Sequence, residues 1–123
     1  MHAAKHDLPI AYESDGIVLH EVEWGEMNVG LEAFPAGLDT APIFRGLPDD
    51  RCQCPHWGYV VRGKMRVRYA DHDEVLAAGD AYHLAPGHTI EMLEPSEIVE
   101  FSPRSLYQQT MEVAERNIAA RQR

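Results

Sequence analysis

Two short segments of the sequence carry side chains of the kind that bind transition metals. Cys52, Cys54 and His56 occupy every second position of the first segment, and His88 follows a Pro-Gly pair in the second. Thiolate sulfur and imidazole nitrogen are ligands that zinc prefers, while iron and copper take them less commonly. If the four side chains face one interior, they can form a metal site or another reactive site.

The direction of these side chains follows from the strand that we expect over residues 64–69. This strand alternates three cations with three apolar residues: Lys64, Arg66 and Arg68 with Met65, Val67 and Tyr69. Three cations on one face place that face in solvent, so the apolar face points to the core. We interpret Arg62-Gly63 as a two-residue hairpin loop that joins this strand to another over residues 56–61.

The same alternation extends backwards through the preceding strand. The residues on its inner face are then Val60, Gly58, His56, Cys54 and Cys52. Pro55 weakens the last part of this extension, because proline interrupts strands. Trp57 and Tyr59 fall on the outer side. The sequence therefore predicts that two thiols and an imidazole point inward together.

Each of these residues also has an ordinary interpretation. A single inward histidine is more often a hydrogen-bonded core residue than a ligand, and a buried free cysteine usually behaves as a small apolar side chain. The combination of Cys-x-Cys-x-His with a second histidine after Pro-Gly favours a site. We assign His83 to the structure rather than to the site. Tyr69 and Glu91 are candidates for proton transfer nearby.

The elements that must position these residues are short strands. Alternating segments separated by Gly, Pro and Asp turns recur about every 8–12 residues, which is typical of a sandwich or barrel made only of strands. In residues 27–34, for example, Met27, Val29, Leu31 and Ala33 alternate with polar or small residues. The expected strands cover residues 17–22, 27–34, 56–61, 64–69, 74–76, 81–84, 89–93 and 97–102.

The C-terminal part of the sequence has a helical pattern instead. Ser102-Pro103 suits a helix start, and Leu106, Met111 and Ile118 recur at helical spacing. We expect one amphipathic helix over residues 103–120 that packs on the barrel or on a partner subunit. With 123 residues the chain forms one domain, 1–123, whose barrel core covers about residues 17–102.

Composition and charge exclude several classes of partner. The chain has 11 basic and 20 acidic residues and a net charge of −9, so we expect binding neither to nucleic acid nor to an anionic membrane surface. Two cysteines in one Cys-x-Cys pair are no disulfide framework. Neither an apolar signal segment nor a run of about 18 apolar residues is present, which favours a cytoplasmic protein.

Two segments resemble the motifs of the cupin family. Residues 59–67 resemble the strand–Gly–strand that closes the first cupin motif, and residues 76–88 resemble the Gly-Asp…Pro-Gly-His form of the second. The resemblance covers roughly residues 25–102. It implies a cupin-type double-stranded β-helix, the jelly-roll barrel, here followed by a C-terminal helix.

The expected cupin ligands are only partly present. The motif glutamate aligns with His56, the two motif histidines align with Asp50 and Cys52, and Ile90 occupies the usual position of the second-motif histidine. The usual set of three histidines and one glutamate therefore does not carry over. The candidate metal ligands of the altered site are Cys52, Cys54, His56 and His88. This set favours zinc first and iron second.

Three functions remain open at this point. The first is a metal-dependent enzyme that acts on a small molecule, with the reaction type undetermined. The second is a non-catalytic cupin module that binds or senses a small molecule. The third is redox sensing by Cys52 and Cys54, which we rank last because a Cys-x-Cys disulfide is strained. We also expect a homodimer, because Trp24, Trp57 and Tyr59 offer apolar area for an interface.

Overall fold

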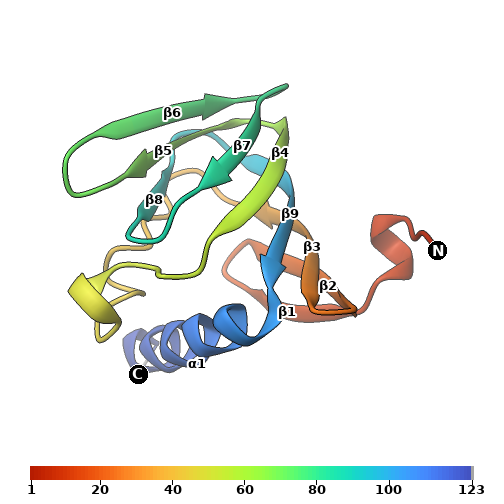
Figure 1. The fold of residues 1–123 in the computed structure, drawn as a ribbon, viewed down its shortest axis with the longest axis horizontal. Helices are drawn as coiled ribbons and strands as arrows, with labels where there is room; N and C mark the ends of the chain where they lie inside the picture. The colour runs from red at the N-terminus through yellow and green to blue at the C-terminus, as the bar shows by residue number, and fades with distance from the viewer. Residues whose placement is uncertain (123) are drawn as a thin grey trace.

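Two antiparallel sheets and one C-terminal helix form the fold in the computed structural model, which describes residues 1–122 (Figure 1). The larger sheet has the strand order β1-β2-β3-β9-β4-β7, and the smaller has the order β6-β5-β8. The elements are η1 (Lys5–Asp7), β1 (Ile10–Ser14), β2 (Ile17–Trp24), β3 (Met27–Phe34), η2 (Pro48–Asp50), β4 (His56–Arg62), β5 (Lys64–Arg68), β6 (Asp73–Ala77), β7 (Ala81–Leu84), β8 (Thr89–Met92), β9 (Ser96–Pro103) and α1 (Arg104–Arg121).

The expected hairpin between the strands at residues 56–61 and 64–69 does not form. β4 pairs with β7 and β9 in the larger sheet, whereas β5 pairs with β6 and β8 in the smaller one. The chain crosses between the sheets at Gly63, which has φ +97°. A Cβ atom there would lie 2.4 Å from the Pro95 carbonyl oxygen, so the crossing needs glycine. Apolar and polar residues alternate in the same way whether two consecutive strands form a hairpin or lie in different sheets. The predicted pairing of these two strands was therefore wrong.

The expected side-chain directions are nevertheless confirmed. Val60, Met65 and Val67 are at most 1% exposed and pack between the sheets. The cations of β5 lie on the outer face of the smaller sheet, where Arg66 and Arg68 bond the Glu91 carboxylate. Alternation along each strand fixes these directions whichever strand lies beside it.

One strand was not expected from the sequence. β1 pairs with β2 at the edge of the larger sheet, with Ile10 exposed and Tyr12 partly buried. Its five residues, Ile-Ala-Tyr-Glu-Ser, show weak alternation because an edge strand buries little of its surface. The remaining strands agree with the expected ranges to within two residues.

The helix α1 lies across one end of the two sheets (Figure 1). Tyr107, Thr110 and Ala114 are its buried residues, and Tyr107 and Ala114 share a second core with Ile43 and both cysteines. The expected helix over residues 103–120 is thus confirmed with a shift of one residue. Within residues 1–122, no helix combines the length and the apolar character needed to cross a membrane.

Candidate metal centre

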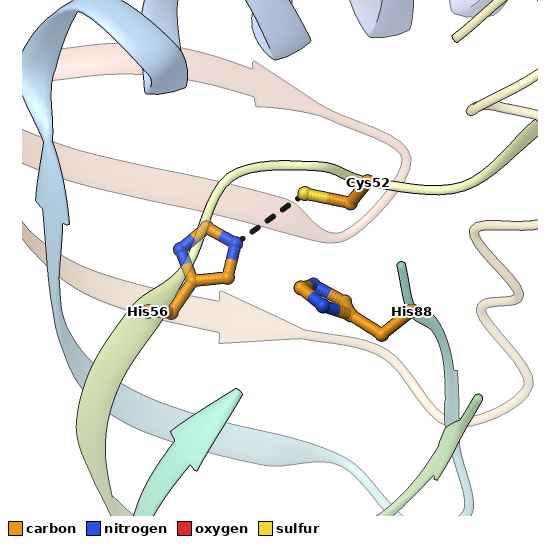
Figure 2. A group of neighbouring side chains, drawn as sticks. All are labelled: Cys52, His56 and His88. Carbon is orange, nitrogen blue, oxygen red and sulfur yellow. Dashed lines mark hydrogen bonds between the residues drawn. The ribbon is translucent and has the colours of Figure 1, made fainter. Parts of the chain in front are cut away.

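Three of the four expected ligands meet inside the barrel. The ligand atoms of Cys52, His56 and His88 all lie within 4.8 Å of one another, and the three residues are 1%, 6% and 0% exposed. Figure 2 shows the three side chains pointing toward one another. Cys52 comes from the loop before β4, His56 opens β4, and His88 immediately precedes β8. The first residue of β4 and the segments just before β4 and β8 therefore supply the site.

Backbone hydrogen bonds hold two of these segments together. The Cys52 N–H donates to the His88 carbonyl oxygen at 2.9 Å, and the Gly87 N–H donates to the Cys52 carbonyl oxygen at 2.7 Å. This isolated antiparallel bridge places the thiol and the second imidazole beside each other without any help from their side chains.

His88 is prepared to act as a ligand. Its Nδ1 donates to the Ala85 carbonyl oxygen at 2.7 Å, so Nδ1 carries the proton and Nε2 has a free lone pair. That Nε2 is buried and has no hydrogen-bond partner within residues 1–122. Burial is the main cause that lowers the pKa of His88, to about 4, so the ring is neutral near pH 7. A buried nitrogen without a partner is costly unless something binds it.

His56 is held in place by two partners of its Nδ1 atom. Its Nδ1 lies 2.7 Å from Ser102 Oγ and 3.7 Å from Glu100 Oε1, whereas its Nε2 lies 3.5 Å from Cys52 Sγ. Metal-binding histidines usually donate their second ring N–H to a carboxylate, a carbonyl or a water in this way. The arrangement turns Nε2 toward the thiol and toward the cavity.

The two cysteines differ in their placement. Burial raises the pKa of Cys52 to about 11 and that of Cys54 to about 12, so both are thiols near neutral pH. Cys54 is buried as expected, but its thiol bonds the Pro55 carbonyl oxygen at 3.4 Å and lies outside the three-residue cluster. Neutral buried thiols are poor nucleophiles, which argues against redox sensing.

A cavity of about 110 Å³ adjoins the cluster, and all three residues line it. Three protein ligands beside a cavity can hold a metal with one position left for a small molecule, as in catalytic rather than structural zinc sites. Part of the wall is acidic, with Glu32 from β3 and Glu100 from β9.

The acidic residues are the part of the site that sequence reasoning missed. Burial, followed by the neighbouring Glu100, raises the pKa of Glu32 well above its ordinary value. The Tyr82 hydroxyl donates to Glu100 at 3.1 Å, and Gly58 leaves room for this tyrosine, since a Cβ there would lie 2.4 Å from the hydroxyl. The polar face of β3 carries Asn28 and Glu32 inward, and the sequence carries no signal for this direction, because a polar strand face ordinarily points to solvent.

The other candidates lie around the cavity rather than in it. The Tyr69 hydroxyl accepts a hydrogen bond from the Ala85 N–H at 3.1 Å. The Tyr69 ring packs edge to face against the His88 ring, with 6.2 Å between the ring centroids. Glu91 bonds the two arginines of the outer face, at 2.9 Å and 3.1 Å. His83 is exposed and stacks on Trp57 with 5.0 Å between the ring centroids. Tyr69 thus supports a ligand, and Glu91 and His83 face solvent.

Comparisons with known proteins agree with this fold. No protein-family profile matches the sequence, and no curated relative matches it. Among solved structures, an RmlC-like cupin from Shewanella frigidimarina is similar with a TM-score of 0.60 and 17% identity, over 82% of this chain and 88% of that one. KdgF from Halomonas sp. has a TM-score of 0.58 and 27% identity, over 82% and 91%.

A third neighbour is a much longer protein. The S161A mutant of Bacillus subtilis oxalate decarboxylase OxdC has a TM-score of 0.62 and 17% identity, over 82% of this chain and 28% of that one. Two packed antiparallel sheets, a ligand cluster between them and these neighbours lead to one conclusion. This chain has the cupin fold, with a buried Cys/His/His cluster that could hold a metal in the barrel.

Proposed function

We propose that this protein binds one divalent transition metal through Cys52, His56 and His88 and acts on a small molecule in the adjoining cavity. The observation that carries this proposal is the buried, unpartnered Nε2 of His88, which faces a thiol and a second imidazole. One sulfur and two nitrogens favour zinc, with iron second. A metal held there would supply Lewis-acid chemistry to an oxygen of the bound molecule.

The residues of the chain would bind the substrate and move protons. The Nδ1 atoms of His56 and His88 bond other groups, which leaves the Nε2 of His88 without a partner and directs the Nε2 of His56 at the Cys52 thiol. Glu32 and Glu100 lie in the same wall, and burial, followed by the neighbouring Glu100, raises the pKa of Glu32 well above its ordinary value. A carboxyl group of this kind is suited to general acid–base work. The reaction type stays open among dioxygenase, isomerase and lyase chemistry.

Metal content and a cobalt spectrum test the proposal. Protein purified without an affinity tag, then loaded with zinc or cobalt(II), should bind about one metal per chain and show sulfur-to-cobalt charge transfer. Cys52→Ser and His88→Ala should each lower the affinity at least about tenfold. Cys54→Ser is the matched control and should bind normally, because its thiol lies outside the cluster. Less than about 0.2 metal per chain after loading would contradict the proposal.

A non-catalytic role is the second candidate. The cavity wall is largely apolar, as expected for a module that binds a small molecule without turning it over. A ligand that raises the melting temperature and is recovered chemically unchanged after long incubation with the metal-loaded protein supports this role. Chemical conversion of the ligand during the incubation supports the metal-dependent enzyme instead.

We also propose a homodimer that forms through the outer face of the larger sheet. Trp57, Tyr59 and Val61 on β4 and Phe101 on β9 are exposed there, and Trp57 lies opposite Phe101 in the sheet. Contiguous exposed aromatic residues favour a protein interface. Light scattering should give about twice the mass of the chain, and Tyr59→Glu should halve it. A single-chain mass for the unmodified protein would contradict this prediction.

A further inference from the structure

Several polar side chains of the cavity wall form one connected group at the metal cluster. Burial, and then the neighbouring Glu100, raises the pKa of Glu32, so these two carboxyl groups lie together. Glu100 Oε1 lies 3.7 Å from His56 Nδ1, and His56 Nε2 lies 3.5 Å from Cys52 Sγ. Thr110 Oγ1 in turn lies 3.9 Å from Cys52 Sγ. The cavity therefore has a polar end, and the cluster is part of it.

The other polar side chains of the wall are already bonded or lie at its rim. Thr40 Oγ1 donates to the Ile90 carbonyl oxygen at 3.3 Å and accepts from the Ile90 N–H at 2.8 Å. The Tyr107 hydroxyl donates to the Glu21 carboxylate. Tyr12 also lines two neighbouring surface hollows, which places it at the rim. Away from the cluster, the wall therefore offers little hydrogen bonding to a second polar group of a ligand.

The rest of the wall is apolar and the space is small. The apolar side chains include Phe34, Leu38, Ile43, Phe44, Met92 and Ile98. The cavity of about 110 Å³ is somewhat smaller than an apolar cavity of about 150 Å³ that admits benzene. Each methylene buried against such a wall raises the affinity about fourfold, whereas a polar group buried there without a partner lowers it.

One face of α1 gives the cavity a direction. Thr110, Ala114 and Ile118 all line the cavity and follow one another at intervals of four residues, so they share one face of the helix. Thr110 is the member that contacts the Cys52 thiol. Ala114 lies about 6 Å further along the helix axis and Ile118 about 12 Å further. The wall along α1 thus changes from polar at the cluster to apolar away from it.

We infer that the cavity takes a molecule with an oxygen-bearing head at the cluster and an aliphatic tail along α1, and that Ala114 and Ile118 limit the length of this tail. The head is a carboxylate, carbonyl or hydroxyl, which a metal at the cluster would hold; without a metal, a hydroxyl donates to His88 Nε2. This inference rests on the proposed function, because it names the substrate class of the same site. Molecules with a second polar group at the far end are disfavoured.

Two pairs of probes, in which a terminal methyl group is replaced by a hydroxyl of similar size, test the inference. Pentanoate and 4-hydroxybutyrate are titrated into zinc-loaded protein, and 1-butanol and 1,3-propanediol into zinc-free protein. The backbone amides of Ile90, Thr110 and Ala114 at the cavity are followed in uniformly ¹⁵N-labelled protein. The methyl-ended member of each pair should give saturable shifts and should bind at least about tenfold more tightly than its hydroxyl-ended partner.

A variant of the helix face tests the limit on tail length. In the zinc-loaded protein, pentanoate should bind about fifteenfold more tightly than propanoate, because it buries two more methylenes. Ala114→Val fills part of the space and should reduce this gain below about fourfold. Ala120→Val, at an exposed position of the same helix, is the matched control and should keep the gain. If Ala114→Val fails to fold, Ile118→Ala replaces it and should let heptanoate gain at least about threefold over pentanoate.

Several results would overturn the inference. These are a hydroxyl-ended probe that binds as tightly as its methyl-ended partner in either pair, a chain-length gain that the helix variant leaves unchanged, and no saturable shift with any probe. Zinc uptake is measured separately by elemental analysis. A protein that takes up no zinc contradicts the proposed metal function, and the comparison of 1-butanol with 1,3-propanediol then decides the inferred ligand class.

Discussion

At the scale of single residues, the proton on Cys52 controls the proposed metal site. Its pKa of about 11 means that the metal-free thiol is protonated near neutral pH, and metal uptake must release this proton. The zinc affinity should therefore rise about tenfold for each pH unit between about pH 6.5 and 8.5. His88 adds nothing to this slope, because its pKa of about 4 keeps it neutral in this range. Competition with a coloured chelator measures the affinity.

Two cysteine variants show whether the Cys52 proton causes the pH dependence of the zinc affinity. Cys52→Ser should bind more weakly and lose most of the slope, whereas Cys54→Ser should keep both the affinity and the slope, because its thiol bonds the Pro55 carbonyl oxygen. An affinity of the unmodified protein that does not change with pH would show that Cys52 is no ligand.

Strand alternation is sufficient to predict which residue types come together at the cluster. It places Cys52 and His56 on the inward face, where the structure has them. It does not separate Cys54 from them, because both cysteines precede β4, where no strand fixes the side-chain direction, and both are 1% exposed. Glu32 and Glu100 could not be predicted as interior residues, since charged side chains usually face solvent.

At the scale of elements, hydrogen bonds from one helical side chain hold α1 in place. Asn117 Nδ2 donates to the carbonyl oxygens of Ile43 and Arg45, at 2.7 Å and 2.8 Å. Asn117→Ala should lower the free energy of unfolding by about 1–2 kcal/mol and should speed amide exchange across residues 104–121. Gln109→Ala, on the exposed side of the helix, is the control. Equal exchange in both variants would contradict this role.

Strand pairing is the part of the elements that the sequence could not predict. Residues 56–62 and 64–68 have the pattern of a hairpin, but the chain crosses between the sheets at Gly63, where Pro95 and Ser96 approach closely. Those contacts come from a strand more than thirty residues further along the chain. Local pattern determines side-chain direction, and distant packing determines the partner strand.

At the scale of the whole molecule, the buried acid pair makes stability depend on pH. Burial, then Glu100, raises the pKa of Glu32 above 4.5, so the folded protein holds this proton more tightly than the unfolded chain does. This contribution to stability is fully present below pH 4.5 and is lost as pH rises through the raised pKa. The loss is about 1.4 kcal/mol for each unit by which the pKa is raised.

Comparison with a neutral side chain isolates this effect. The free energy of unfolding of Glu32→Gln minus that of the unmodified protein should grow as pH rises from 4.5, as measured by urea denaturation at several pH values. Glu94→Gln should show a constant difference, because its side chain is exposed. A constant difference for Glu32→Gln as well would show that Glu32 has an ordinary pKa.

The backbone bridge between Cys52 and His88 also bears on the order in which the protein is assembled. Its hydrogen bonds use only main-chain atoms, so the thiol and the imidazole are adjacent as soon as the chain has folded. The entropy of closing the loop between residues 52 and 88 is then lost during folding rather than during metal capture. Folding and metal loading become separate events, and a newly made chain can wait, folded and empty, for its metal.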